Sequence, residues 1–210
     1  MMTVKTEPCH CKMKQIDRKL KDGFEYYYYQ CSKCARVEYP VCQAQKLYEY
    51  AEEHQFMFID DWILAWLYVG DGAPVLGITK LQKELFVILM EFAQENDIPS
   101  ENPGFRAYKF GPYTERIDRC VQTLMEMGWI SSIGRMNTDS ERFILTDDGM
   151  PHGEKALSKL TDDQIQKFRI LKGDMQQFST KGIMTYVYKN YPEYTNESIV
   201  FERTLHRRRK

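Results

Sequence analysis

Four cysteines near the N-terminus have the residue type and spacing of a metal site: Cys9, Cys11, Cys31 and Cys34. Tetrahedral zinc needs four soft or borderline ligands, and two short cysteine turns joined by a β-hairpin can bring four thiolates to one point, as in zinc ribbons. The first pair is separated by one residue instead of the usual two, which leaves open that His10 or Cys42 replaces one thiol.

The segment that carries these cysteines is too short to build much core of its own, so a metal would act as its staple. Asp22-Gly23 and the run of tyrosines after it favour two or three short strands with a tight turn at Gly23. In a reducing cytosol such clustering indicates metal rather than disulfides. We therefore predict a structural Zn²⁺, and a closed four-thiolate site would leave no open position for catalytic water.

A second set of residues could contact nucleic acid. A helix over residues 112–127 would be the one to enter a major groove, with Thr114, Arg119 and Gln122 off its apolar stripe. The available phosphate contacts are the four basic residues Lys80, Lys83, Arg135 and Arg142. Glu115 and Asp118 on the same helix would face phosphates, so a solvated helix face of mixed charge is the alternative interpretation.

Charge is distributed unevenly along the chain, although its net value is −1. Residues 61–150 carry 8 basic and 14 acidic side chains, a net charge of −6, whereas residues 151–210 carry 12 and 7, a net charge of +5. The acidic middle opposes the sequence-independent electrostatic term of DNA binding. The basic end, Arg207-Arg208-Arg209-Lys210, could contact nucleic acid or an acidic partner, and a solvated terminus is the favoured interpretation.

Patterns of enzymatic chemistry are absent from the sequence. The histidines at 54, 152 and 206 have no matching nucleophile or carboxylate pattern, and no zinc-protease helix or nucleophile elbow occurs. Residues 72–77 have the glycine spacing of a phosphate loop, but they follow a predicted helix and are followed by Ile78-Thr79-Lys80, with Ile78 where the lysine should come. Cys120 lies on an apolar helix face and is expected in the core. We predict a protein that is not an enzyme.

Length and hydropathy bound the architecture. A chain of 210 residues suffices for one domain or two small ones, and its longest apolar run, residues 62–69, is far below the ~18 residues of a membrane helix. No apolar stretch precedes the first cysteine, so a secretory signal is not visible and the cytoplasm is the expected compartment.

Periodicity divides the chain into a zinc-ribbon module over 1–40, a linker helix over 41–59, a winged-helix-like domain over 60–150 and C-terminal helices over 151–210. In the third part, helices start at Asp60-Asp61, at Thr79 with Gln82 as a capping box, and at Pro112. Strands over 129–133 and 142–146 then form a hairpin. Thr161 with Gln164 caps a later helix.

The apolar stripes of the three central helices predict one shared core. Its members should be Trp62, Trp66, Leu81, Leu85, Leu89, Ile117, Val121 and Leu124. The expected fold class is therefore α+β but mostly α, with a small N-terminal zinc ribbon followed by a winged helix-turn-helix-like domain.

Several stretches together resemble the winged-helix-like family that includes the SocA-like antitoxins, also called the Panacea domain, with its phage-associated and archaeal relatives. The most distinctive are Leu81-Gln82-Lys83 and the turn over 108–113, Tyr-Lys-Phe-Gly-Pro-Tyr; the segments at 63–68, 143–149 and 187–198 add to the resemblance, which covers about residues 60–200. The cysteine-rich head is similar to zinc ribbons that precede helix-turn-helix parts in some antitoxin-type regulators.

This resemblance implies a non-enzymatic protein of prokaryotic or phage defence contexts that binds a toxin or a protease-adaptor partner, and sometimes DNA. It transfers no catalytic residue and no binding signature. We expect a binding regulator of antitoxin type, in a toxin–antitoxin system, and keep a sequence-specific DNA-binding transcription regulator as the alternative. Because the central unit is acidic, we favour binding to a partner protein over binding to DNA. A homo-oligomer is also possible.

Overall fold

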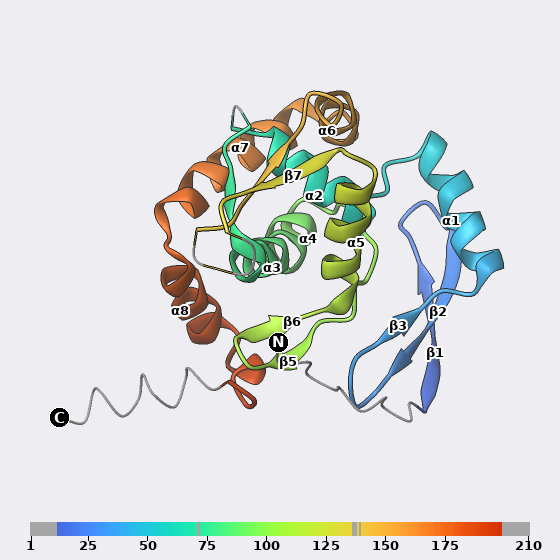
Figure 1. Ribbon diagram of the computed structural model, residues 1–210. Coiled ribbons are helices and arrows are strands. Elements are labelled where there is room, and N and C mark those ends of the chain that lie inside the picture. The colour runs from blue at the N-terminus through green and yellow to red at the C-terminus, as the bar shows by residue number, and fades with distance from the viewer. Residues whose placement is uncertain (1–11, 71, 136–137, 139, 199–210) are drawn as a thin grey trace.

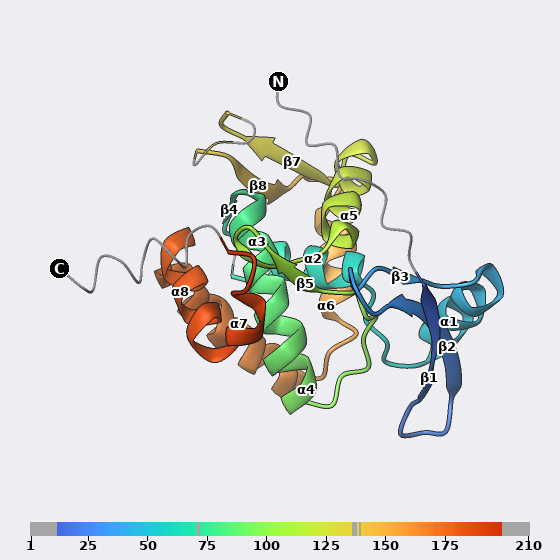
Figure 2. The same ribbon diagram turned by 90° about the horizontal axis from the view of Figure 1, so that it is seen from below.

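The computed structural model describes residues 12–70, 72–135, 138 and 140–198, and it shows an α+β protein that is mostly α. His10, Cys9, Cys11 and the basic end at 207–210 lie outside the described residues. Among the described residues, no helix combines the length and the apolar character that crossing a bilayer requires. Figures 1 and 2 show a small N-terminal part beside a larger helical body.

The N-terminal part is a three-stranded antiparallel sheet in the order β1-β2-β3, formed by β1 (Met13–Lys19), β2 (Glu25–Cys31) and β3 (Val37–Glu38). The turn between β1 and β2 contains Gly23 at φ +94°, a conformation that glycine adopts without steric cost, so the predicted hairpin is confirmed. Helix α1 (Val41–Glu53) packs on this sheet, and together with Phe56, which follows the helix, they form a core of four buried residues: Tyr26, Tyr28, Leu47 and Phe56.

The body is built around α2 (Ile59–Tyr68), α3 (Gly77–Val87) and α5 (Glu115–Glu126). Helix α3 continues through a π-helical turn, η1 (Ile88–Phe92), into α4 (Ala93–Glu95). A second three-stranded antiparallel sheet has the order β4-β8-β7, from β4 (Val75–Leu76), β7 (Ile130–Ile133) and β8 (Arg142–Leu145). The β7–β8 hairpin was predicted; β4 was not, because two residues cannot show an alternating pattern.

The predicted central core is confirmed. All eight residues of the three helical stripes are buried in one hydrophobic cluster: Trp62, Trp66, Leu81, Leu85, Leu89, Ile117, Val121 and Leu124. Cys120 is 1% exposed in the same cluster, as expected. Burial of these aromatic and aliphatic side chains is the main force that holds α2, α3 and α5 together.

The C-terminal segments belong to that same core. Helices α6 (Met150–Leu157), α7 (Asp162–Gln177) and α8 (Thr180–Asn190) contribute buried side chains to it, among them Phe168 and Val187, and η2 (Pro192–Tyr194) follows. The capping box at the start of α7 is confirmed, since Thr161 Oγ1 accepts the Gln164 N–H and the Gln164 side chain accepts the Thr161 N–H.

Three predicted helix starts were wrong by a few residues. Helix α2 begins at Ile59 with Phe58 as its N-cap residue, and Asp61 accepts the Phe58 N–H at 3.0 Å. Helix α3 begins at Gly77 and not at Thr79. Helix α5 begins after Thr114, because Pro112, which was expected to open it, belongs to strand β6 (Gly111–Tyr113), which pairs with β5 (Arg106–Tyr108).

The N-terminal part is docked on the body mainly through the loop after α4. The Asn102 side chain donates to the Tyr28 hydroxyl at 2.8 Å, and its backbone N–H donates to the Tyr39 hydroxyl at 3.2 Å. Gly104 packs so closely on the Ala35 carbonyl that a Cβ there would lie 2.2 Å from that oxygen. These contacts fix the sheet beside the start of α5 (Figure 2).

Candidate functional site

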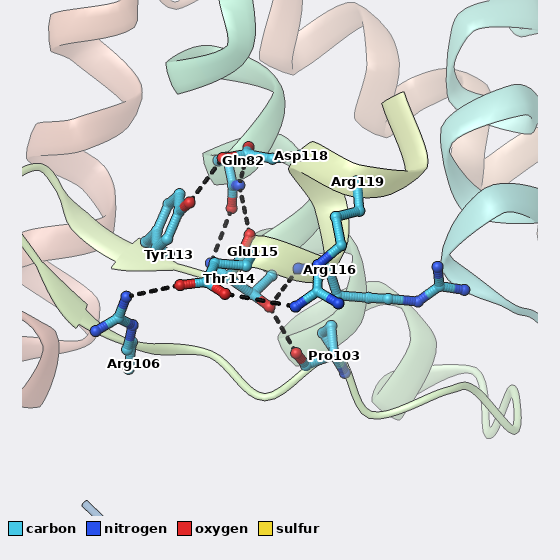
Figure 3. Close-up of polar contacts among 9 residues, drawn as sticks. All are labelled: Gln82, Pro103, Arg106, Tyr113, Thr114, Glu115, Arg116, Asp118 and Arg119. Atoms are coloured by element: carbon cyan, nitrogen blue, oxygen red, sulfur yellow. Dashed lines mark hydrogen bonds and ion pairs between the residues drawn. The ribbon is translucent and has the colours of Figure 1, made fainter. Parts of the chain in front are cut away.

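The N-terminus of α5 is held by a polar network that joins three separate segments (Figure 3). Gln82, on α3, donates from Nε2 to the Thr114 carbonyl at 2.8 Å, and its Oε1 accepts the Thr114 N–H at 3.2 Å. Lys83, the next residue, donates from Nζ to the Pro112 carbonyl at 2.7 Å. The two most distinctive sequence motifs, about 30 residues apart, are therefore connected by hydrogen bonds that place α5.

Thr114 is the N-cap residue of α5 and is 3% exposed. Its Oγ1 accepts the Arg116 N–H at 3.2 Å, which satisfies one of the unpaired donors of the first helical turn. The same hydroxyl donates to the Pro103 carbonyl at 2.6 Å, so the cap also ties α5 to the loop after α4.

Asp118 is turned inward by its neighbours. One oxygen accepts from Gln82 at 2.8 Å and the other from the Tyr113 hydroxyl at 2.7 Å. Burial, followed by the bond to Asp118, raises the pKa of Tyr113, while burial lowers the pKa of Lys83 to about 7 against the opposing charge of Asp118. The prediction that Asp118 would face phosphates was wrong, because both its oxygens are used within the protein.

A part-buried ion pair links the start of α5 to the loop after α4, and through it to α2. Arg116 donates from Nε to Glu101 Oε1 at 2.7 Å and from Nη2 to Glu101 Oε2 at 3.2 Å. Glu101, which is 7% exposed, also accepts the Ile59 N–H at 3.0 Å. This bidentate geometry makes the pair a rigid brace rather than a loose surface contact.

The solvent side of α5 carries paired polar groups. Glu115 lies 3.4 Å from Arg119 on the next turn and 3.4 Å from Arg106 of β5, and Gln122 donates to Glu126 at 2.9 Å. Glu115, Arg119, Gln122 and Glu126 are all exposed. This face, defined by those four side chains, is polar, mixed in charge and accessible.

The structure separates the predicted nucleic-acid contacts into two groups. Lys80, Lys83 and Thr114, which were expected to contact DNA, are buried in this structure. The Lys80 ammonium lies 3.5 Å from Glu84 inside the body, and Lys83 and Thr114 hold the backbone as described above.

The remaining four lie at the surface. Arg119 and Gln122 are exposed on α5, and Arg135 is exposed in the hairpin loop after β7. Arg142 on β8 is half-buried, with its Nη1 donating to the Ser140 carbonyl at 2.8 Å.

The described half of the predicted zinc site is a tight turn at the end of β2. Cys31 is 2% exposed, and its sulfur accepts the Lys33 N–H at 3.4 Å. Ala35 adopts φ +56°, and its N–H donates to the Cys31 carbonyl at 3.0 Å, which closes the turn around Cys34. A backbone donor aimed at the sulfur suits a thiolate better than a neutral thiol, because the charged form is the stronger acceptor.

Within the described residues, no three cysteine, histidine or acidic side chains gather as a metal site would require. Two of the four predicted ligands lie outside those residues, so this observation does not test the prediction. Cys42 is exposed near the start of α1.

No family model matches the chain, and no curated protein matches it.

Proposed function

We propose that this protein is a non-enzymatic regulator of antitoxin type that binds a partner protein through the exposed face of α5. One observation carries the proposal: the helix face available for binding holds Glu115 and Glu126 beside Arg119, whereas the lysines expected to contact phosphates are buried. A mixed-charge face suits a protein partner, since DNA affinity depends on neutralising several phosphates.

The proposal is supported by the arrangement of the elements. Helices α2, α3 and α5 pack around one core, and β7–β8 forms a hairpin beside them to which β4 adds a third strand. This order is typical of winged helices, in which the third helix and the hairpin are the common contact elements. The β5–β6 hairpin lies between α3 and α5, so the connection is longer than an ordinary helix-turn-helix turn.

The alternative function is sequence-specific DNA binding. The observation in its favour is that Arg119 and Gln122 on α5, and Arg135 beside β7, are exposed. Arginine and glutamine form the paired hydrogen bonds that read guanine and adenine, respectively. The face also carries acidic groups, which is why we rank this function second.

A pair of experiments separates the two functions. We expect a stable complex when the chain is coexpressed with the product of the neighbouring gene, and we expect Arg119→Glu to weaken it. Arg169→Glu is the matched control, because Arg169 is exposed on α7. Duplex DNA should bind no tighter than about 10⁻⁴ to 10⁻⁶ M at physiological salt. Nanomolar, sequence-selective binding to DNA upstream of its own gene, lost in Arg119→Ala, would overturn the ranking.

We also propose a structural Zn²⁺ bound by Cys9, Cys11, Cys31 and Cys34. The support is the turn around Cys31 together with the register of β1, in which Met13 lies opposite Cys31. Cys11 is two residues before Met13, so the Cα atoms of Cys11 and Met13 can be at most about 7 Å apart. The zinc would cross-link the ends of β1 and β2, and a reducing cytoplasm would keep the thiols available.

Elemental analysis tests the zinc proposal. Protein purified without chelator should hold about one zinc per chain, and Cys34→Ser should lose it. Cys42→Ser is the control and should keep full occupancy. Loss of zinc in Cys42→Ser together with retention in Cys11→Ser would move the ligand assignment to Cys42, and metal-free protein with an ordered N-terminal sheet would refute the site.

A further inference from the structure

A cleft of about 760 Å³ lies between the turn of the β1–β2 hairpin and the segment that runs from α4 to β5. Figure 2 shows these two segments, which come from the N-terminal part and the body. The wall of the cleft that belongs to the body is largely apolar and includes Met90, Ile98 and Phe105. The volume falls in the ordinary range of ligand clefts, about 300 to 1,000 Å³.

Arg18 on β1 lines this cleft and is held in place by a buried partner. Its Nε and Nη2 donate to the Tyr28 hydroxyl at 3.2 and 2.9 Å, and that tyrosine is 0% exposed. Asn102, from the body, donates to the same hydroxyl at 2.8 Å. The guanidinium is therefore fixed by a neutral group, and its charge is not cancelled by a carboxylate.

The other lysine, aspartate and glutamate side chains of the cleft have partners. Lys19 lies 2.9 Å from Glu25, Lys21 lies 2.7 Å from Asp97, Glu101 is paired with Arg116, and Asp22 accepts from the Tyr50 hydroxyl at 2.6 Å. Among the lysine and arginine side chains that line the described cleft, Arg18 is the one without a carboxylate partner.

We propose that this cleft binds a short segment of the partner protein in which a carboxylate lies beside an apolar side chain. Arg18 would pair with the carboxylate, and Met90, Ile98 and Phe105 would contact the apolar side chain. The inference rests on the proposed function only in taking the ligand from a partner protein. The shared chemistry is a carboxylate, from an acidic side chain or from a chain terminus.

The charge pattern favours a single carboxylate over a polyanion. Asp22, Asp97 and Glu101 line the same cleft and would repel a run of phosphates, whereas one carboxylate can pair with Arg18 alone. The Lys21–Asp97 ion pair crosses from the hairpin to the loop after α4, and both side chains are exposed. Exposed pairs contribute little stability, so a ligand can displace this one.

Fluorescence polarisation with three labelled synthetic peptides tests the inference on the full chain. The first, Gly-Leu-Asp-Leu-Gly amide, carries an acidic side chain. The second, Gly-Leu-Asn-Leu with a free C-terminus, carries a terminal carboxylate, and the third, Gly-Leu-Asn-Leu-Gly amide, carries neither. We expect the first or the second to bind more tightly than the third, and the stronger of the two identifies the source of the carboxylate.

Arg18→Gln should lower the affinity for that peptide about ten- to hundredfold, the ordinary range for a hydrogen bond to a charged group. Lys14→Gln is the matched control, because Lys14 is exposed on the same strand but does not line the cleft. Asp97→Asn should strengthen binding by up to about fivefold, since it removes a repelling carboxylate and releases Lys21. Thermal unfolding of each variant confirms that it is folded.

Several outcomes would overturn the inference: equal binding of the neutral peptide, unchanged affinity in Arg18→Gln, no binding of any peptide at about 1 mM, or displacement of the peptide by a single-stranded oligonucleotide. These outcomes are distinct from failure of the proposed function. A partner complex that is weakened by Arg119→Glu but not by Arg18→Gln would retain the function and reject the cleft, whereas peptide binding without a partner complex would do the reverse.

Discussion

Replacing Gln82 with methionine should cost the protein a large part of its stability, although the two side chains have similar length. Gln82 is 2% exposed and makes three hydrogen bonds, two with the backbone of Thr114 and one with Asp118. Each neutral bond contributes about 1 kcal/mol, and the bond to the carboxylate about 1.5 to 3 kcal/mol. Methionine would also leave the buried Thr114 N–H without its partner. The expected loss is about 3 to 5 kcal/mol, against a total stability of about 5 to 15 kcal/mol.

Equilibrium unfolding in urea, followed by far-ultraviolet circular dichroism, measures this loss. For a chain of this size the melting temperature should fall by roughly 10 °C. The matched control is Gln122→Met on α5, where an exposed glutamine makes one bond to Glu126, and its loss should stay under about 0.5 kcal/mol. If Gln82→Met lowered the free energy of unfolding by less than about 1 kcal/mol, the hydrogen bonds from Gln82 would not be what positions α5.

Two further perturbations test the same region. The buried Lys83 ammonium has its pKa lowered from 10.5 to about 7, so between these values the unfolded chain binds a proton that the folded protein lacks. Stability should therefore rise with pH from about 7 to 10 relative to Lys83→Met, while Lys14→Met, at an exposed lysine, keeps the wild-type slope; parallel urea midpoints for wild type and Lys83→Met would contradict this. Gly111→Ala should destabilise by about 1 to 3 kcal/mol, because φ is +89° and the new Cβ would lie 2.7 Å from the Tyr188 ring. Gly173→Ala in α7 has open space and should be neutral or stabilising by up to about 1 kcal/mol, so equal melting temperatures for the two alanine variants would refute the strain argument.

Features that depend on neighbours within a few residues could be predicted from the sequence. The turn at Gly23 and the capping box of Thr161 and Gln164 both follow from local backbone chemistry. The central core was predictable too, since apolar residues at helical spacing must bury one face of each helix whatever covers it. The spacing of Cys31 and Cys34 likewise indicates a metal turn, and its partners stay a prediction.

The candidate site depended on contacts that no local pattern contains. From the sequence, Lys80 and Lys83 were interpreted as basic residues available to phosphates. In the structure Lys80 lies beside Glu84 inside the body, and Lys83 donates to the Pro112 carbonyl, 29 residues away in the chain. Gln82 read as a capping residue of its own helix, and the structure uses it to hold Thr114 instead. A polar side chain finds its partner where the packed elements place one, so its role is decided by which distant backbone groups burial would otherwise leave unpaired.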